Sequence, residues 1–266
     1  MRPLLALATL ASLLALAGCS NHAGMPTSSG AQGTVRIQIT DSPGAYEAVN
    51  LVIEEVSIHR DLPDSLAGWE VLNSTPGTYD LMQLRNGVFA TLGQAMVPAG
   101  HYTQVRLKLG AGSNLVVDGV THPLVVPSGM QSGYKLITGF EVPANRLIDL
   151  ALDFDAARSI HLTGSGKYML RPVCRVMAFS TAGSIAGRVL PDTSRAEIFA
   201  LMGADTVATT APGMEGRFML TPLGAGTYTV TIHPASPYRD TSFAGVVVTA
   251  QHTTDLGDIQ LTIPPD

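Results

Sequence analysis

Apolar and polar residues alternate along most of this chain, as in strands that bury one face. The first clear case is Val35–Thr40, and a longer one covers Val49–Arg60. In the longer segment the apolar positions are odd-numbered as far as Ile53 and even-numbered from Val56. Because a strand changes its buried face only at an extra residue, we predict a β-bulge at Glu54-Glu55.

Short strands separated by turn residues are expected throughout the rest of the chain. Asp118-Gly119, between two apolar runs, predicts a two-residue hairpin, and Asn86-Gly87 predicts another turn. Other strands are expected at 69–72, 104–109, 147–155, 168–179, 184–189, 197–201, 217–220, 227–232, 245–249 and 258–263. Strands of about five residues with regularly spaced turns are typical of β-sandwiches.

A short internal repeat suggests two related sandwiches. Val97–Thr103 reads Val-Pro-Ala-Gly-His-Tyr-Thr, and Leu223–Thr229 reads Leu-Gly-Ala-Gly-Thr-Tyr-Thr. In each copy a glycine turn precedes a strand headed by a tyrosine, whose ring we expect to cap one end of a sandwich. We therefore predict an all-β fold of two consecutive Ig-like β-sandwich domains, at residues 34–180 and 183–263.

The N-terminal segment predicts a lipid anchor. Residues 4–17 contain only Leu, Ala, Thr and Ser. This run of roughly 14 residues is shorter than the ~20 that a membrane-spanning helix needs. It follows Arg2 and ends in Leu-Ala-Gly-Cys, which resembles the cleavage box of bacterial lipoprotein signal peptides. The resemblance implies a signal peptide at 1–18, cleavage between Gly18 and Cys19, and diacylglycerol and palmitate on Cys19.

The residues after this box predict how the protein is held. Residues 19–33 are rich in Ser, Gly, Ala and Thr, so we expect a flexible tether after the lipidated Cys19. Each buried methylene contributes ~0.8 kcal/mol, so several acyl chains anchor a protein firmly in the lipid bilayer. By resemblance to Gram-negative sorting, Ser20 favours the outer membrane. The expected location is the cell envelope, with the membrane face left open.

Charge and cysteine content exclude several classes of protein. The chain has 16 Lys and Arg against 21 Asp and Glu, a net charge of -5, and its basic residues never cluster. This argues against nucleic acid as a partner, because such proteins need a basic surface. With Cys19 lipidated, Cys174 has no intrachain disulfide partner, so stability is expected from apolar burial. We expect no cofactor.

The first half resembles a known family. The resemblance rests on four stretches, which are Thr40–Gly44 followed by 49–59, Pro127–Gly133, Leu152–Asp155 and Gly166–Val173. Together they resemble the bacterial lipoprotein family called domain of unknown function 4382, over about Thr34–Phe179. Resemblance to that family implies no particular activity.

The second half resembles the carboxypeptidase regulatory-like, or transthyretin-like, sandwich at Gly187–Val189, Gly216–Leu220 and Leu223–Val230. Relatives of that module include carbohydrate-binding and adhesion modules, so the fold alone does not define a function.

Three aspartates form the first candidate site. Asp149, Asp153 and Asp155 share one face of the strand at 147–155, and Arg171 and Arg175 share a face of the strand at 168–179. Opposed rows of this kind predict cross-strand ion pairs. The alternative is a ligand or Ca²⁺ site, since hard cations take several oxygen ligands, but no EF-hand loop accompanies these residues.

Other residues suggest little chemistry. The seven histidines are not spaced like metal ligands, and no nucleophile motif is present, so neither a metal site nor a catalytic residue is predicted. Trp69 follows a loop and is either a core residue or an exposed sugar contact.

The expected function is a non-enzymatic binding or structural role at the envelope, with a glycan or an envelope protein as partner. The alternative is a carbohydrate-binding accessory protein, and the third hypothesis is a hydrolase using the acidic strand face.

Overall fold

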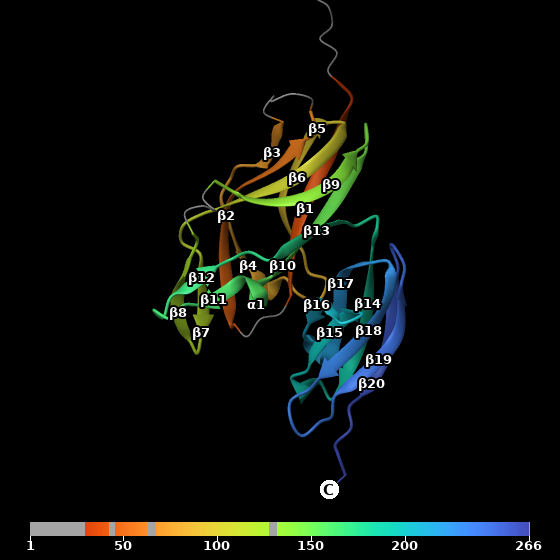
Figure 1. Cartoon of the computed structure of the whole chain (residues 1–266). Coiled ribbons are helices and arrows are strands. Elements are labelled where there is room, and N and C mark those ends of the chain that lie inside the picture. The colour runs from red at the N-terminus through yellow and green to blue at the C-terminus, as the bar shows by residue number, and fades with distance from the viewer. Residues whose placement is uncertain (1–29, 43–45, 63–67, 128–131, 266) are drawn as a thin grey trace, which may run out of the picture.

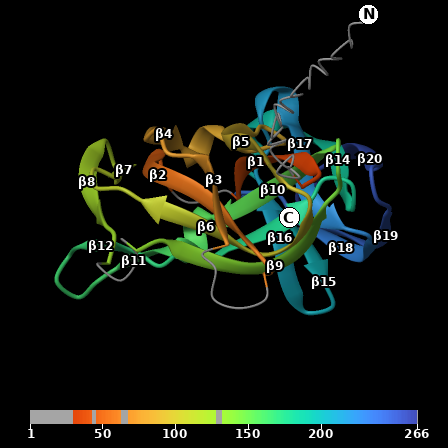
Figure 2. The ribbon, with the colours of Figure 1, turned by 90° about the horizontal axis from the view of Figure 1, so that it is seen from above.

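In the computed structural model the chain forms two bodies built almost entirely of strands (Figure 1). The structure describes residues 30–42, 46–62, 68–127 and 132–265. The predicted signal peptide, Cys19 and residues 20–29 of the predicted tether lie outside these residues. Figure 2 shows the same two bodies from above. Within the described residues, no helix has the length and apolar character that a membrane crossing requires.

The first body packs a small sheet against a large one. The small sheet has the order β13 (Cys174–Ala178), β10 (Leu147–Asp155), β1 (Gln32–Ser42) and β5 (Ala90–Pro98). The large sheet has the order β11 (Ile160–Leu162), β12 (Tyr168–Leu170), β8 (Val120–Val125), β7 (Asn114–Val117), β2 (Ala48–Arg60), β6 (Gly100–Leu109) and β9 (Tyr134–Val142). Two more strands, β3 (Trp69–Asn73) and β4 (Gly77–Asp80), pair with β2. The inward side chains of both sheets form one apolar core.

The second body is a smaller sandwich with a separate core. One sheet contains β17 (Arg217–Gly224), β14 (Ala182–Leu190) and β20 (Thr253–Gln260). The other contains β16 (Asp205–Thr210), β15 (Glu197–Met202), β18 (Gly226–His233) and β19 (Thr241–Val248). The predicted all-β fold of two consecutive sandwiches is confirmed. The limits 34–180 and 183–263 stay predictions.

The two sandwiches share connectivity and register. β1 pairs in parallel with β10 and antiparallel with β5, and β14 pairs in the same two ways with β20 and β17. Gly33 lies opposite Val97, and Gly183 lies opposite Leu223. Each glycine allows close packing, since a Cβ would lie 2.3 Å from a carbonyl oxygen, that of Pro143 or Thr249.

The two tyrosines of the repeat occupy equivalent positions. Tyr102 donates from Oη to the carbonyl of Pro98 at 2.8 Å, and Tyr228 donates to the carbonyl of Gly224 at 2.7 Å. Both rings are buried in their cores. A tyrosine that bonds back to the chain a few residues upstream is a known feature of β-sandwiches. The repeat seen in the sequence therefore marks the same corner in both sandwiches.

Local predictions were correct where turn chemistry decides the conformation. The register of β2 against β6 shifts between Ile53 and Glu55, which confirms the bulge. Asp118 and Gly119 have φ angles of 49° and 71° and join β7 to β8, which confirms the hairpin.

Some strand boundaries were wrong. The strand expected at 168–179 is two strands, β12 in the large sheet and β13 in the small sheet, interrupted at Pro172. Proline has no N–H to donate to a ladder, so the chain changes sheets there. β19 and β20 begin four and five residues earlier than the expected 245 and 258. The sequence pattern did not predict β5, β9, β11 and β16.

Candidate binding cleft between the two sandwiches

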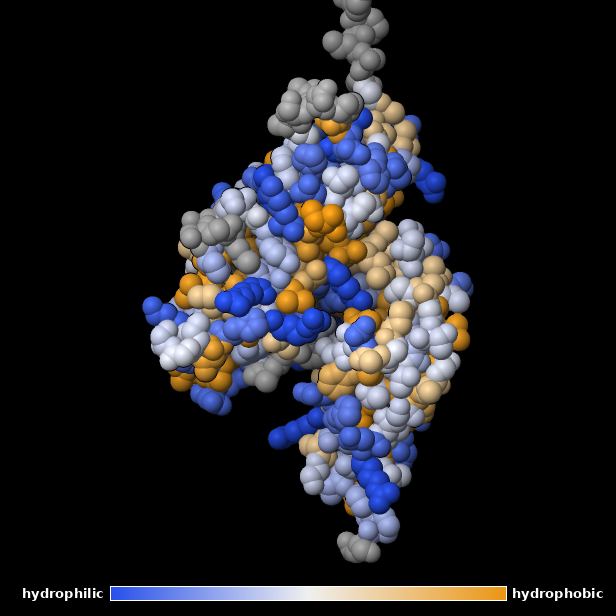
Figure 3. All heavy atoms as spheres, in the orientation of Figure 1, coloured by the Kyte–Doolittle hydropathy of each residue, from blue (hydrophilic) through white to orange (hydrophobic). Residues whose placement is uncertain are grey.

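A cavity of about 460 Å³ lies between the two sandwiches. The first sandwich contributes the ends of β1 and β10, the short helix α1 (Ala156–Ser159) and the start of β13. The second contributes β15 and β16. Figure 3 shows the hollow where the two bodies meet. This volume lies within the range of small-molecule sites, which commonly form at domain boundaries.

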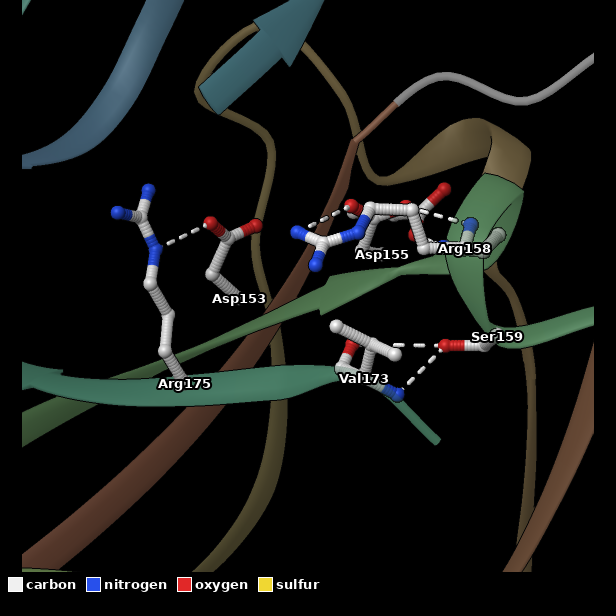
Figure 4. Close-up of polar contacts among 8 residues, drawn as sticks. Asp153, Asp155, Arg158, Ser159, Val173 and Arg175 are labelled. Carbon is white, nitrogen blue, oxygen red and sulfur yellow. Dashed lines mark hydrogen bonds and ion pairs between the residues drawn. The ribbon is translucent and has the colours of Figure 1, made fainter. Parts of the chain in front are cut away.

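Asp153 and Arg175 form an ion pair at the inner wall of this cleft. The two residues lie opposite each other on β10 and β13, and Arg175 Nε donates to Asp153 Oδ2 at 2.8 Å (Figure 4). The Asp153 side chain is only 9% exposed. Burial raises the pKa of Asp153 to about 6, and the neighbouring Arg175 opposes this rise. Arg175 also donates from Nη2 to the carbonyl of Pro222 at 2.9 Å, across the boundary between the sandwiches.

Asp155 and Arg158 form a second pair beside the first. Asp155 caps α1, because its Oδ1 accepts from the backbone N–H of Arg158 at 2.8 Å. Arg158 Nη1 lies 3.8 Å from Asp155 Oδ2. Ser159, at the end of the same turn, accepts from the N–H of Val173 at 2.8 Å and so holds the start of β13 (Figure 4).

The third predicted aspartate lies elsewhere. Asp149 pairs with Arg36 of β1, whose Nη2 donates to Asp149 Oδ2 at 2.8 Å, and it does not line the cleft. The predicted cross-strand pairing is thus confirmed for Asp153 and Arg175. It is wrong for Arg171, which is exposed in the connection between β12 and β13. Within the described residues, no three His, Cys, Asp or Glu side chains are grouped as metal ligands would be.

Trp69 lies outside the cleft. It stands on the outer face of the large sheet, half-buried, and takes no part in either apolar core. Arg106 Cζ lies 4.1 Å from the centroid of the indole, and the ring of His59 meets it edge-on at 4.9 Å. The interpretation of Trp69 as a core residue is therefore wrong. Part of its ring surface is covered by an arginine of the same protein.

Burial raises the pKa of two groups near the cleft. Burial raises the pKa of the Cys174 thiol to about 12, so the thiol stays protonated at neutral pH. Asp41 accepts from the N–H of Ala156 at 3.0 Å, and its other carboxyl oxygen is buried without a partner among the described residues. Burial raises the pKa of Asp41 well above its usual range.

The sequence reasoning missed Arg158 and Phe199 as cleft residues. Phe199 has the opposite strand parity to the core residues Ile198 and Ala200, which is a local signal that it points outward. No local signal shows that α1 of the first sandwich faces β15 of the second.

The fold and cleft define an all-β protein of two sandwiches with a ligand-sized cavity between them. Residues 32–172 match the family model described as a domain of unknown function (DUF4382). The match covers more than half of the 266 residues, so the chain belongs to this family. No curated protein matches the chain.

Several solved structures are similar over part or most of the chain. A type II cohesin–X-dockerin complex from Acetivibrio cellulolyticus is 24% identical, over 30% of this chain and 58% of that one, with a TM-score of 0.25. The minor pilin GBS52 of Streptococcus agalactiae is 10% identical over 87% of this chain and 97% of that one, with a TM-score of 0.25. The major pilin BcpA of Bacillus cereus is 10% identical over 88% and 71%, with a TM-score of 0.26. At such TM-scores no conclusion about function follows.

Proposed function

We propose that this protein is a lipid-anchored envelope protein that binds a ligand in the cleft between its sandwiches without transforming it. The observation that carries the proposal is the 460 Å³ cavity with two ion pairs on one wall. The cell-envelope location is supported by the Leu-Ala-Gly-Cys box and the tether, and the outer membrane of a Gram-negative bacterium is supported by Ser20.

The chemistry of the cleft supports binding over catalysis. Asp153 accepts a hydrogen bond from Arg175, and Asp155 caps α1, so both carboxylates already have structural roles. The one thiol at the cleft, that of Cys174, is held protonated. The contrary hypothesis is a hydrolase in which Asp153, with its pKa near 6, acts as general acid.

The second sandwich is proposed to be a carboxypeptidase regulatory-like, or transthyretin-like, module. Its motif residues Arg217–Leu220 and Leu223–Val230 fall on β17 and β18. In this proposal the module completes the cleft through Phe199 and the residues of β16.

The anchor is tested by growing cells with labelled palmitate. Wild-type protein and Cys174→Ser should be labelled and sediment with outer membranes, whereas Cys19→Ser should be unlabelled. Labelling that persists in Cys19→Ser, or a wild-type protein released as a soluble form, would refute the anchor.

Catalysis is tested with a panel of glycoside, ester and peptide substrates. We expect no turnover by the wild type. Turnover that disappears in Asp153→Asn and survives in the exposed-site variant Asp258→Asn would show that the protein is a hydrolase.

A further inference from the structure

The cleft has a wall of balanced charge, which we call the charged floor and which consists of Asp153, Asp155, Arg158 and Arg175. All four residues line the cavity, and they form two neighbouring acid–base pairs. The charges cancel within the set, and Glu197 of β15 adds one acidic side chain across the cavity.

The charged floor keeps unused hydrogen-bonding capacity. Asp153 bonds Arg175 through Oδ2, and its Oδ1 makes no hydrogen bond within the described part of the chain. The Arg158 side chain is 67% exposed, and its separation of 3.8 Å from Asp155 is too long for a hydrogen bond. Free acceptors and free donors therefore lie on the same wall.

The opposite wall of the cleft carries apolar side chains, hydroxyl groups and the exposed carboxylate of Glu197. Phe199 of β15 and Val207 of β16 face the cavity, and the threonines at 206 and 209 line it as well. Thr210 also lines it, but its hydroxyl already donates to Asn86 Oδ1 at 2.7 Å. An aromatic ring presents a flat apolar surface to a ligand, and hydroxyls can either donate or accept.

We infer that the cleft binds a neutral glycan, an inference that rests on the proposed function as a non-enzymatic binding protein. A sugar hydroxyl both donates and accepts, so it can bridge a carboxylate and a guanidinium of the charged floor without separating either pair. The C–H face of a pyranose ring packs against Phe199. Trp69, whose ring carries Arg106, is not part of this site.

Other ligand classes fit the cleft less well. An anionic ligand meets the carboxylates of the charged floor and of Glu197, and a cationic ligand meets an arginine beside each carboxylate of the charged floor. A zwitterion, such as a short free peptide, has to displace an arginine or a carboxylate from its partner at each of its charged ends.

The test is calorimetric titration of the full acylated protein in neutral-lipid nanodiscs. The probes are neutral tetrasaccharides (cellotetraose, mannotetraose, xylotetraose and N-acetylated chitotetraose), with tetragalacturonate as an anionic probe and tetraglycine as a zwitterionic one. We expect at least one neutral tetrasaccharide to bind, and Phe199→Ala and Arg158→Ala to weaken it about tenfold each. Trp69→Ala and Arg217→Ala are the matched aromatic and arginine controls and should bind like the wild type.

The outcomes separate the glycan inference from the proposed function. Binding of tetraglycine or tetragalacturonate alone, weakened by both cleft variants, overturns the neutral-glycan inference and keeps the proposed function. Binding of a neutral sugar that both cleft variants retain, or binding of no probe, overturns both. Cleavage of a bound sugar overturns the non-enzymatic function and keeps the ligand class. Arg158→Ala changes an exposed side chain, so its result stands even if Phe199→Ala fails to fold.

Discussion

Arg175 donates to Asp153 from Nε at 2.8 Å, and its Nη2 reaches the carbonyl of Pro222 in the second sandwich at 2.9 Å. One guanidinium thus neutralises a buried carboxylate and joins the two bodies that enclose the cleft. The stability of the first sandwich and the geometry of the candidate site consequently depend on the same side chain.

Replacing Arg175 by methionine should destabilise the protein. The change keeps the length of the side chain but leaves the Asp153 carboxylate buried without its cation. We expect a loss of about 2 kcal/mol in the free energy of unfolding, less than for a fully buried pair because Arg175 is one third exposed. Urea denaturation measures this loss. Arg217→Met, at a side chain that is 72% exposed, is the control and should change stability little.

Asp153 should make stability depend on pH. Its pKa rises from an ordinary value near 3.9 in the unfolded chain to about 6 in the folded one, so the folded state binds the proton more tightly. The resulting stabilisation is fully present below about pH 4 and is lost as the pH rises through 6. Between these limits the free energy of unfolding should fall by about 3 kcal/mol from this residue.

The measurement compares denaturant unfolding of the wild type and Asp153→Asn from pH 4 to pH 7. The difference between the two proteins should follow the slope expected for one carboxyl group. Asp258→Asn is the surface control. A difference that stays constant over this pH range would contradict the raised pKa of Asp153.

The two equivalent tyrosines should contribute equally. Tyr102→Phe and Tyr228→Phe each remove one hydroxyl that bonds a carbonyl, and each should cost about 1 kcal/mol. Because the two residues lie in separate sandwiches, the double variant should show the sum. Tyr238→Phe is the control, since within the described chain its hydroxyl makes no hydrogen bond. A loss in Tyr238→Phe as large as in the other two would refute a role for the corner hydrogen bonds.

Asn86 should hold the second sandwich against the first. Its Nδ2 donates to the carbonyl of Ala211 at 2.8 Å, and its Oδ1 accepts from Thr210 Oγ1 at 2.7 Å and from the N–H of Met219 at 3.2 Å. The residue has a φ of 55°, so Asn86→Gly removes these bonds without adding backbone strain. Docking should weaken by about 2 kcal/mol.

Limited proteolysis of the connection near residue 180, together with small-angle scattering, measures this weakening. Asn86→Gly should be cut faster and should have a larger radius of gyration than the wild type. Asn145→Gly, at an exposed asparagine with a φ of 57°, should behave like the wild type. Equal cleavage of the wild type and Asn86→Gly would show that other contacts hold the sandwiches together.

Local features could be predicted from the sequence because local rules decide them. The parity change between Ile53 and Val56 required a bulge, and Asp118-Gly119 required a tight turn, whatever the rest of the chain does. The strand expected at 168–179 failed for a nonlocal reason. The chain leaves one sheet and joins the other at Pro172, and an alternating pattern does not say which sheet a strand enters.

The candidate site depended more strongly on the tertiary structure. The sequence placed Asp149, Asp153 and Asp155 on one face, since the side-chain period of a strand is two. The order of the strands in the sheet decides which arginine pairs with each aspartate. Asp149 pairs with Arg36, which lies 113 residues away in sequence on a neighbouring strand.

The sequence by itself determined the all-β class, the two related sandwiches and the expectation of a lipid on Cys19. Each follows from a short local pattern, namely the alternation of apolar and polar residues, the internal repeat and the Leu-Ala-Gly-Cys box. Only the tertiary structure decided that Phe199 and Arg158 line one cleft and that Trp69 carries an arginine on its ring. These contacts arise from packing between segments far apart in the chain. The alternation of apolar and polar residues in a strand does not depend on what its outward-facing side chains contact, so the sequence pattern does not reveal these contacts.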